Sequence, residues 1–175
     1  MEKEIKFKIR QAKKDDAKQL LDIYRPYVEN TAVTCDCTLP SVNEFENKIT
    51  SISQKYPFLV AELNGQILGY VYAKELYNRE AFRFSAEISI YVSQNYRKNS
   101  IGKNLYKEIE KELIDRNISN VYASVVYSGF SDKYINNDSF IFHQHLGYKK
   151  VGHFTNCIYK FGKWYDMVWM EKILK

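Results

Sequence analysis

The stretch from Glu87 to Leu113 constrains the fold of this chain more than any other segment. Its first seven residues, Glu87 to Ser93, form an apolar run that predicts a strand. A short polar and basic loop follows, and then Ile101, Leu105, Ile109 and Leu113 recur at helical spacing. The segment therefore predicts a strand that passes through a short loop directly into a long amphipathic helix.

That loop favours an anionic ligand. The start of a helix offers unpaired backbone N–H groups and the positive end of the helix dipole, and Arg97, Lys98 and Lys103 add full charges. The combination suits a pyrophosphate. The dinucleotide fingerprint is excluded because its glycine triplet is missing, and a nucleotide-hydrolase phosphate loop is excluded because no Gly-Lys-Ser/Thr ending is present.

The remaining pattern predicts one domain, residues 1–175, with an α/β (α+β) fold. Asn64-Gly65 between two apolar runs predicts a hairpin, Ser41 with Glu44 a capping box, and Gly147 a helix C-terminus. The element order indicates a sheet of mixed direction with helices on both faces. The predicted strands are 5–9, 58–62, 66–73, 86–92, 121–126, 148–155 and 164–170. The predicted helices start at Asp15 and Asp16, at Ser41, at Ile101, and at Asn137 or Asp138.

Composition narrows the partners and the location. The net charge of +5 is compatible with an anionic ligand but is too dispersed for nucleic acid. No apolar run approaches the ~20 residues of a membrane span, and the charged N-terminus does not look like a signal peptide, so we expect a cytoplasmic protein with no membrane partner. Cys35, Cys37 and Cys157 lack Cys-x-x-Cys spacing and are expected to be free thiols.

The loop and the element order resemble the GNAT superfamily of N-acetyltransferases. Arg97-Lys-Asn-Ser-Ile-Gly102 is similar to the superfamily motif Gln/Arg-x-x-Gly-x-Gly/Ala, with Ser100 in place of the first glycine. Nearly the whole chain resembles the phosphinothricin and methionine sulfoximine acetyltransferases. The matching segments are Ile9-Arg-x-Ala12, Val28-Glu-Asn-Thr31, Tyr56-Pro-Phe-Leu-Val-Ala61, Gly69-Tyr-Val-Tyr-Ala73, Arg79-x-Ala-Phe82, Ala86-Glu-x-Ser-x-Tyr-Val-Ser93, Asn137-x-Ser-x-x-x-His143-x-x-x-Gly-Tyr148 and Phe161-Gly-x-Trp-x-Asp166.

The resemblance implies a mostly antiparallel central sheet whose fourth and fifth strands splay apart. It also implies acetyl transfer from acetyl-CoA to the primary amine of a small amino-acid-like acceptor, by direct attack in a ternary complex without a metal, in a homodimer. Two features depart from the family: about seven extra residues within Tyr127–Asn136, and Cys35 where Phe is more usual. Two alternatives stay open. One is another amine acceptor, such as a polyamine, an aminoglycoside or a protein N-terminus, and the other is a CoA-binding sensor without turnover.

The resemblance, together with the anion-binding loop, predicts the cosubstrate site. The loop amides would hold the pyrophosphate, and the backbone of residues 90–92 would pair with the pantetheine as an added strand does. Asn137 either bonds a pantetheine amide or only caps its helix. The expected residues are Ile90, Tyr91, Val92, Arg97, Lys98, Asn99, Ser100, Ile101, Gly102, Lys103, Asn137 and Ser139.

Two residues are candidates for proton transfer. Glu87 is expected to be the base that accepts the amine proton, directly or through a water, with an ammonium anchor and a bystander as alternatives. His143 is expected to protonate the departing thiolate, with a structural histidine as the alternative. His145 is expected at the surface.

The acceptor site is expected around Arg79, whose planar fork suits a carboxylate or phosphinate. A solvated loop arginine is the alternative. Trp164 and Asp166 are expected in the core or at a subunit interface. The predicted acceptor residues are Tyr77, Asn78, Arg79, Phe82, Glu87 and Ser89.

Overall fold

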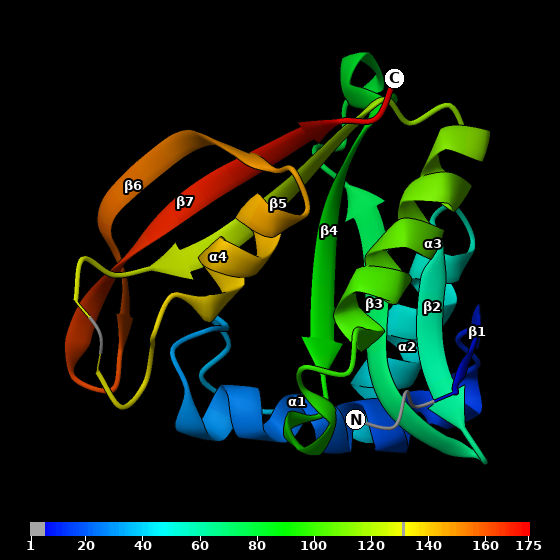
Figure 1. Cartoon of the computed structure of the whole chain (residues 1–175), viewed down its shortest axis with the longest axis horizontal. Coiled ribbons are helices and arrows are strands. Elements are labelled where there is room, and N and C mark those ends of the chain that lie inside the picture. The colour runs from blue at the N-terminus through cyan, green and yellow to red at the C-terminus, as the bar shows by residue number, and fades with distance from the viewer. Residues whose placement is uncertain (1–5, 131) are drawn as a thin grey trace.

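Seven strands form one sheet in the order β1-β2-β3-β4-β5-β7-β6, with helices on both faces (Figure 1). The computed structural model describes residues 6–130 and 132–175. Ile5, the predicted start of the first strand, lies outside the described residues. The strands are β1 Lys8–Gln11, β2 Phe58–Leu63, β3 Gln66–Glu75, β4 Ser85–Val92, β5 Asn120–Tyr127, β6 Lys149–Lys160 and β7 Lys163–Ile173. The α-helices are α1 Ala17–Asn30, α2 Val42–Ser53, α3 Ile101–Asp115 and α4 Asp138–His145.

The alternation of side chains along β2 explains why both faces carry helices. Phe58 and Val60 pack in one apolar cluster with α1 and α2, whereas Leu59 and Ala61 pack in a second cluster with α3. All four side chains are almost completely buried. Residues 58–61 are therefore apolar in succession, as expected for a strand segment covered on both faces, and the predicted layering is confirmed.

The sheet opens between β4 and β5. These two strands are parallel, and their register joins only residues 85–87 to residues 120–122, while every other strand pair is antiparallel. Beyond Glu87 the two strands diverge, which Figure 1 shows as a V. The predicted splay of the fourth and fifth strands is therefore confirmed, and it leaves one side of β4 from Ile88 to Val92 without a strand partner.

Short sequence motifs correctly predicted a hairpin turn and two helix ends. Asn64 and Gly65 both have positive φ (50° and 84°), which a two-residue hairpin with the right twist requires. Ser41 and Glu44 form the reciprocal capping box, and Gly147 ends α4 with a φ of 87°. Asp16, in contrast, does not cap α1: a short 3-10 helix, Lys14–Asp16, precedes α1, and the Asp16 carboxylate accepts two bonds from the Arg10 guanidinium at 2.7 and 2.9 Å.

The last hairpin is longer than predicted. A bulge between Phe154 and Ile158 lets β6 continue, and the Asp166 carboxylate stabilises it by accepting the Asn156 backbone N–H at 2.8 Å. Period-two alternation breaks at a bulge, so the pattern alone cannot carry the strand through it. No helix in the part of the chain that the structure describes is long and apolar enough to cross a membrane.

Candidate active site

The loop between β4 and α3 presents a row of unengaged backbone donors. It contains the 3-10 turn Gln94–Tyr96, and both Lys98 and Ser100 are left-handed, with φ of 67° and 59°. Within the described residues, the N–H groups of residues 97–103 donate no hydrogen bond to the chain. Such a loop at the positive end of a fifteen-residue helix is a fit for a pyrophosphate.

Gly102 keeps this helix start close to α4. A Cβ at this position would lie 3.0 Å from Cζ of Phe142, closer than side-chain carbons normally approach. In this chain, glycine at this motif position therefore avoids a close contact that an alanine Cβ would make with Phe142. Ser100, in contrast, takes the left-handed conformation that favours glycine, which explains why the superfamily motif has glycine at that position.

The V between β4 and β5 forms a narrow cleft. Its enclosed volume is about 50 Å³, less than twice the ~30 Å³ that one water occupies in the liquid. Ile88 to Tyr91 form one wall, Ala123 to Val125 the other, and Val33, Ser139 and His143 close it. The cleft therefore runs between the facing edges of the two strands.

Glu87 lies where the two strands part. Its Oε1 accepts a hydrogen bond from the Ser124 hydroxyl at 2.9 Å, and its Oε2 lies 3.2 Å from the Lys74 ammonium. Only 13% of the Glu87 side chain is exposed. The carboxylate is therefore held from both neighbouring strands, β3 and β5, beside the cleft.

His143 has both ring nitrogens engaged. Nδ1 lies 2.7 Å from the Ser139 carbonyl and Nε2 lies 2.6 Å from the Tyr106 hydroxyl. A carbonyl only accepts, so Nδ1 carries the proton and Nε2 accepts from Tyr106. Burial lowers the pKa of His143 below its usual value, against the opposing effect of the Ser139 bond. The arrangement favours a neutral histidine.

Comparison with known proteins identifies the family. The profile described as "Acetyltransferase (GNAT) domain" matches residues 9–169, which is most of the chain. The chain belongs to the GNAT acetyltransferase family. The L-methionine sulfoximine/L-methionine sulfone acetyltransferase of Pseudomonas aeruginosa is 31% identical over 168 residues, covering 93% of this chain and 92% of that protein.

Two solved structures of GNAT relatives match the fold closely. The phosphinothricin acetyltransferase from Sinorhizobium meliloti, in complex with AcCoA, has a TM-score of 0.86 and 30% identity, covering 97% of this chain and 89% of that one. A structure titled ribosomal-protein-alanine N-acetyltransferase from Brucella melitensis has a TM-score of 0.86 and 32% identity, covering 95% and 99%. The predicted family and fold are confirmed, and relatives of this similarity carry different acceptor names.

The side chain of Asn137 closes a loop instead of capping α4. Asn137 stands at the N-cap position with a φ of 60°, but its side chain makes no bond to the helix. Its amide accepts the Ser128 N–H at 3.0 Å and donates to the Ser128 carbonyl at 2.7 Å. Ser139 lies two residues further on and lines the cleft, and its contact with the cosubstrate stays a prediction.

The loop bearing Arg79 connects β3 to β4. It starts after Glu75, whose Cα partner is Ala86, so it lies at the same end of the sheet as Glu87. Tyr77 and Phe82 pack with ring centroids 4.9 Å apart, and Asn78 and Arg79 are exposed. The Arg79 side chain makes no hydrogen bond or ion pair within the described residues. The loop is therefore near the candidate base, and the anchoring role of Arg79 stays a prediction.

The extra residues within Tyr127–Asn136 brace the loop after α1. The Tyr134 carbonyl accepts the Ala32 N–H at 2.9 Å, and the Tyr134 ring stacks on Phe161 at 4.3 Å. Asp132 accepts the N–H groups of residues 134 and 135 and pairs with Lys163 at 2.8 Å. Because Val33 follows Ala32 and lines the cleft, the insertion stabilises one wall of the site.

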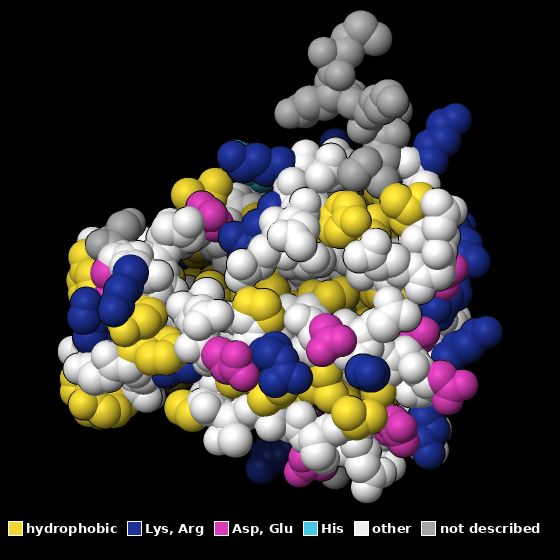
Figure 2. All heavy atoms as spheres, turned by 90° about the horizontal axis from the view of Figure 1, so that it is seen from below, with side chains coloured by type: hydrophobic (Ala, Val, Ile, Leu, Met, Phe, Trp, Pro, Cys, Tyr) yellow, Lys and Arg dark blue, Asp and Glu magenta, His cyan; other side chains and the backbone are white. Residues whose placement is uncertain are grey.

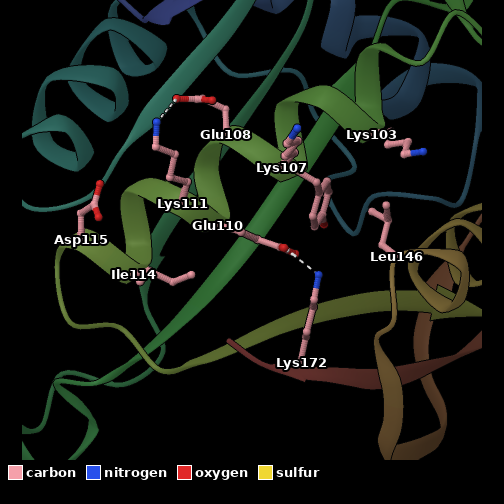
Figure 3. Close-up of a pocket in the computed structure, with 10 residues that line it drawn as sticks. Lys103, Lys107, Glu108, Glu110, Lys111, Ile114, Asp115, Leu146 and Lys172 are labelled. Atoms are coloured by element: carbon pink, nitrogen blue, oxygen red, sulfur yellow. Dashed lines mark hydrogen bonds and ion pairs between the residues drawn. The ribbon is translucent and has the colours of Figure 1, made fainter. Parts of the chain in front are cut away.

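A larger groove lies elsewhere, along α3, β7 and Leu146, the residue that follows α4 (Figure 3). It encloses about 690 Å³, and a Glu110–Lys172 ion pair of 2.6 Å spans it. Of the predicted cosubstrate residues only Lys103 borders it. Its alternating charges largely satisfy one another, so the groove is not the catalytic cleft.

The side chains that bond the two predicted proton-transfer residues were not predicted: Lys74, Tyr106 and Ser124. Each is recognisable only through its partner, Glu87 or His143, on another element. Lys74 and Tyr106 carry no motif, and Ser124 reads as an ordinary polar position in a buried strand. Register and helix packing bring them together, and neither is visible in the sequence before the fold is known.

Proposed function

We propose that this GNAT protein transfers the acetyl group of acetyl-CoA to the primary amine of a small amino-acid-like acceptor. The observation that carries the proposal is that one strand, β4, joins the three required parts. It bears the Glu87 carboxylate at one end, an unpaired edge along the cleft, and the loop of free N–H groups at the other end. The relatives named for phosphinothricin and methionine sulfoximine support the acceptor class.

The residues of the chain fit acetyl-CoA. The free amides of residues 97–103, with Arg97, Lys98 and Lys103, would bind the pyrophosphate. The open edge of β4 at Ile90 and Tyr91 would pair with the pantetheine, because the Val92 carbonyl is already bonded by the Tyr27 hydroxyl at 2.6 Å. The cleft between β4 and β5, lined by Ile90 and Tyr91, lies alongside this edge.

The thioester supplies an activated acyl group, so the protein has to position the amine and move protons. The amine attacks the thioester carbon, the C–S bond breaks, and the thiol leaves with a proton. Glu87, oriented by Ser124 and Lys74, accepts the proton of the attacking amine directly or through a water. The bonds of His143 to Tyr106 and Ser139 favour a structural role for this histidine over proton donation, because one of the two bonds must break before His143 can protonate the thiolate.

A thiol-release assay tests the proposal. Purified protein with acetyl-CoA is given methionine sulfoximine, phosphinothricin, spermidine and a peptide amine in turn. We expect release with the amino acids, and we expect Glu87→Gln to lower kcat about 10²-fold or more without weakening acetyl-CoA binding. Glu75→Gln, an exposed carboxylate on β3, is the matched control. Equal turnover in Glu87→Gln would remove the base role.

The same panel decides between acceptors. The Brucella relative's title keeps a protein N-terminus as the second candidate, and release with the peptide amine alone would favour it. Acetyl-CoA binding with no release for any amine would favour a sensor module.

We place the enzyme in the cytoplasm, because its three cysteines are exposed and unpaired.

We further propose a homodimer formed through the β6–β7 hairpin. Val151, Phe154, Tyr159 and Trp164 are each more than half exposed, and β6 is an edge strand. Figure 2 shows apolar side chains at the left end of the molecule, where Figure 1 places this hairpin. Asp166 bonds His153 and Asn156 of its own chain, so its part in the proposed dimer would be to hold the β6 bulge in shape. Light scattering after size exclusion should give twice the chain mass, and the monomer mass for Trp164→Ser.

A further inference from the structure

We propose that Lys74 selects the acceptor by binding the carboxylate of an α-amino acid whose amine lies against Glu87. The inference rests on the proposed function and specifies the chemistry of its acceptor. It assigns a role to a strand residue that carries no motif.

The position of Lys74 is fixed by the β3–β4 register. Lys74 and Glu87 are direct Cα partners, and the ammonium lies 3.2 Å from Oε2 of the carboxylate. Ser124 occupies Oε1 from the opposite strand. The Lys74 side chain is 47% exposed whereas that of Glu87 is 13% exposed, so the lysine forms the outer, solvent-facing part of the pair.

This pair sets an electrostatic condition on the acceptor. An amine that enters as an ammonium ion must approach Glu87, and Lys74 then lies within a few ångströms of it. Two like charges at that distance repel each other. An acceptor that carries only positive charge, such as a polyamine, can reach Glu87 only by displacing Lys74 without offering it a partner.

An α-amino acid meets the condition, because its ammonium and its carboxylate are attached to the same carbon atom. The ammonium can pair with Glu87 while the carboxylate pairs with Lys74, so one internal ion pair is exchanged for two with the ligand. Glu171, the register partner of Tyr122 on β7, is bonded by the Tyr122 hydroxyl at 2.8 Å. Lys74 therefore supplies the positive charge beside the amine, and it does so from a strand, which positions a group better than a loop does.

The experiment compares two acceptors, one with a carboxylate beside the amine and one with an uncharged carboxamide there, and each variant is measured against wild type with the same acceptor. KM and kcat are measured by thiol release for methionine sulfone and for its carboxamide, with wild type, Lys74→Met and Lys74→Arg. Lys8→Met is the matched control, because Lys8 pairs with Glu62 across neighbouring strands at 2.9 Å far from the cleft.

We expect Lys74→Met to raise KM for methionine sulfone about fivefold, the contribution of a half-exposed ion pair. The KM of the carboxamide should stay constant or fall, because a repulsive charge is gone. Lys74→Arg should restore most of the preference, and Lys8→Met should change neither KM.

Two kinetic results would overturn the inference. An equal change for both acceptors would mean that Lys74 only orients Glu87, and no change would mean that it contacts neither. Calorimetric binding of methionine sulfone separates this inference from the proposed function. Binding that weakens in Lys74→Met, in an enzyme that releases no thiol, would support the inference and refute acetyl transfer.

Discussion

Acidification should destabilise this protein through one residue, His143. The side chain is 4% exposed, and burial lowers the pKa of His143 below its usual value. In the unfolded chain a histidine titrates near pH ~6.5, so below that pH the unfolded state binds a proton that the folded state does not. Stability contributed by neutral His143 is therefore present above pH ~6.5 and is lost as the pH falls through that value.

The magnitude follows from linkage. If His143 stays neutral in the folded protein down to pH 5.5, one histidine costs about 1.2 kcal/mol between pH 7.0 and pH 5.5. With a urea slope of about 2 kcal/mol per molar, the unfolding midpoint should fall by about 0.6 M. The carboxylates with lowered pKa, such as Asp16 and Asp132, lose their contribution only below their ordinary range near pH ~4, so this window belongs to histidine.

Urea unfolding followed by tyrosine and tryptophan fluorescence at pH 7.0, 6.0 and 5.5 measures the effect. His143→Gln should flatten the pH dependence, whereas His145→Gln, an exposed residue on the same helix, should leave it unchanged. A fall in midpoint of the same size in His143→Gln would refute the assignment. Turnover adds a second outcome: near-normal kcat in a folded His143→Gln enzyme would leave the histidine a structural role only.

Two further changes test the loops. Ser100→Gly relieves a left-handed backbone worth ~1–2 kcal/mol but adds unfolded-state freedom worth ~0.4–1 kcal/mol, so the melting temperature should change little or rise. Ser100→Val, a β-branched residue at a φ of 59°, should lower it clearly. Asn137→Ala removes both partners of Ser128, which is 3% exposed, and should cost about 2–4 kcal/mol in urea unfolding. An unchanged midpoint would show that water replaces the amide.

The cosubstrate half of the site could be predicted from the sequence because it is continuous in the chain. A strand, a loop and a helix that follow one another within residues 85–115 fix where the free N–H groups lie, whatever the rest of the fold does. The same reasoning placed Ser100 at a glycine-like position, and its φ of 59° agrees. The strand ends of the last hairpin were missed because a bulge interrupts the alternation on which the prediction depended.

The acceptor half could not be predicted in the same way, because its chemistry depends on pairs far apart in sequence. Glu87 was identified from its motif, but what it can do depends on Lys74 and Ser124, which the β3–β4 register and the β4–β5 approach bring to it. A shift of one residue in the β3 register would turn Lys74 to the α3 face and leave the carboxylate with one partner. The sequence likewise allows His143 to be either a proton donor or a structural histidine, and the contact that favours the structural role, 2.6 Å between its Nε2 and the Tyr106 hydroxyl, joins two different helices.

The proposed cosubstrate site and the proposed acceptor site lie on different parts of the chain, so the choice of acceptor can vary separately from the binding of acetyl-CoA among proteins of this fold. The β4–α3 loop, proposed to bind the pyrophosphate, would do so through backbone groups, so many side-chain changes should leave its donors in place, and Ser100 keeps the left-handed conformation that favours glycine. In the proposed site the acceptor would be recognised by side chains on β3, β4 and β5 and by a wall that the residues around Tyr134 brace. A single exchange at Lys74 would change the charge offered to the acceptor without touching the β4–α3 loop. Acceptor preference can therefore change while acetyl-CoA binding is retained, and relatives of similar identity can carry different acceptor names.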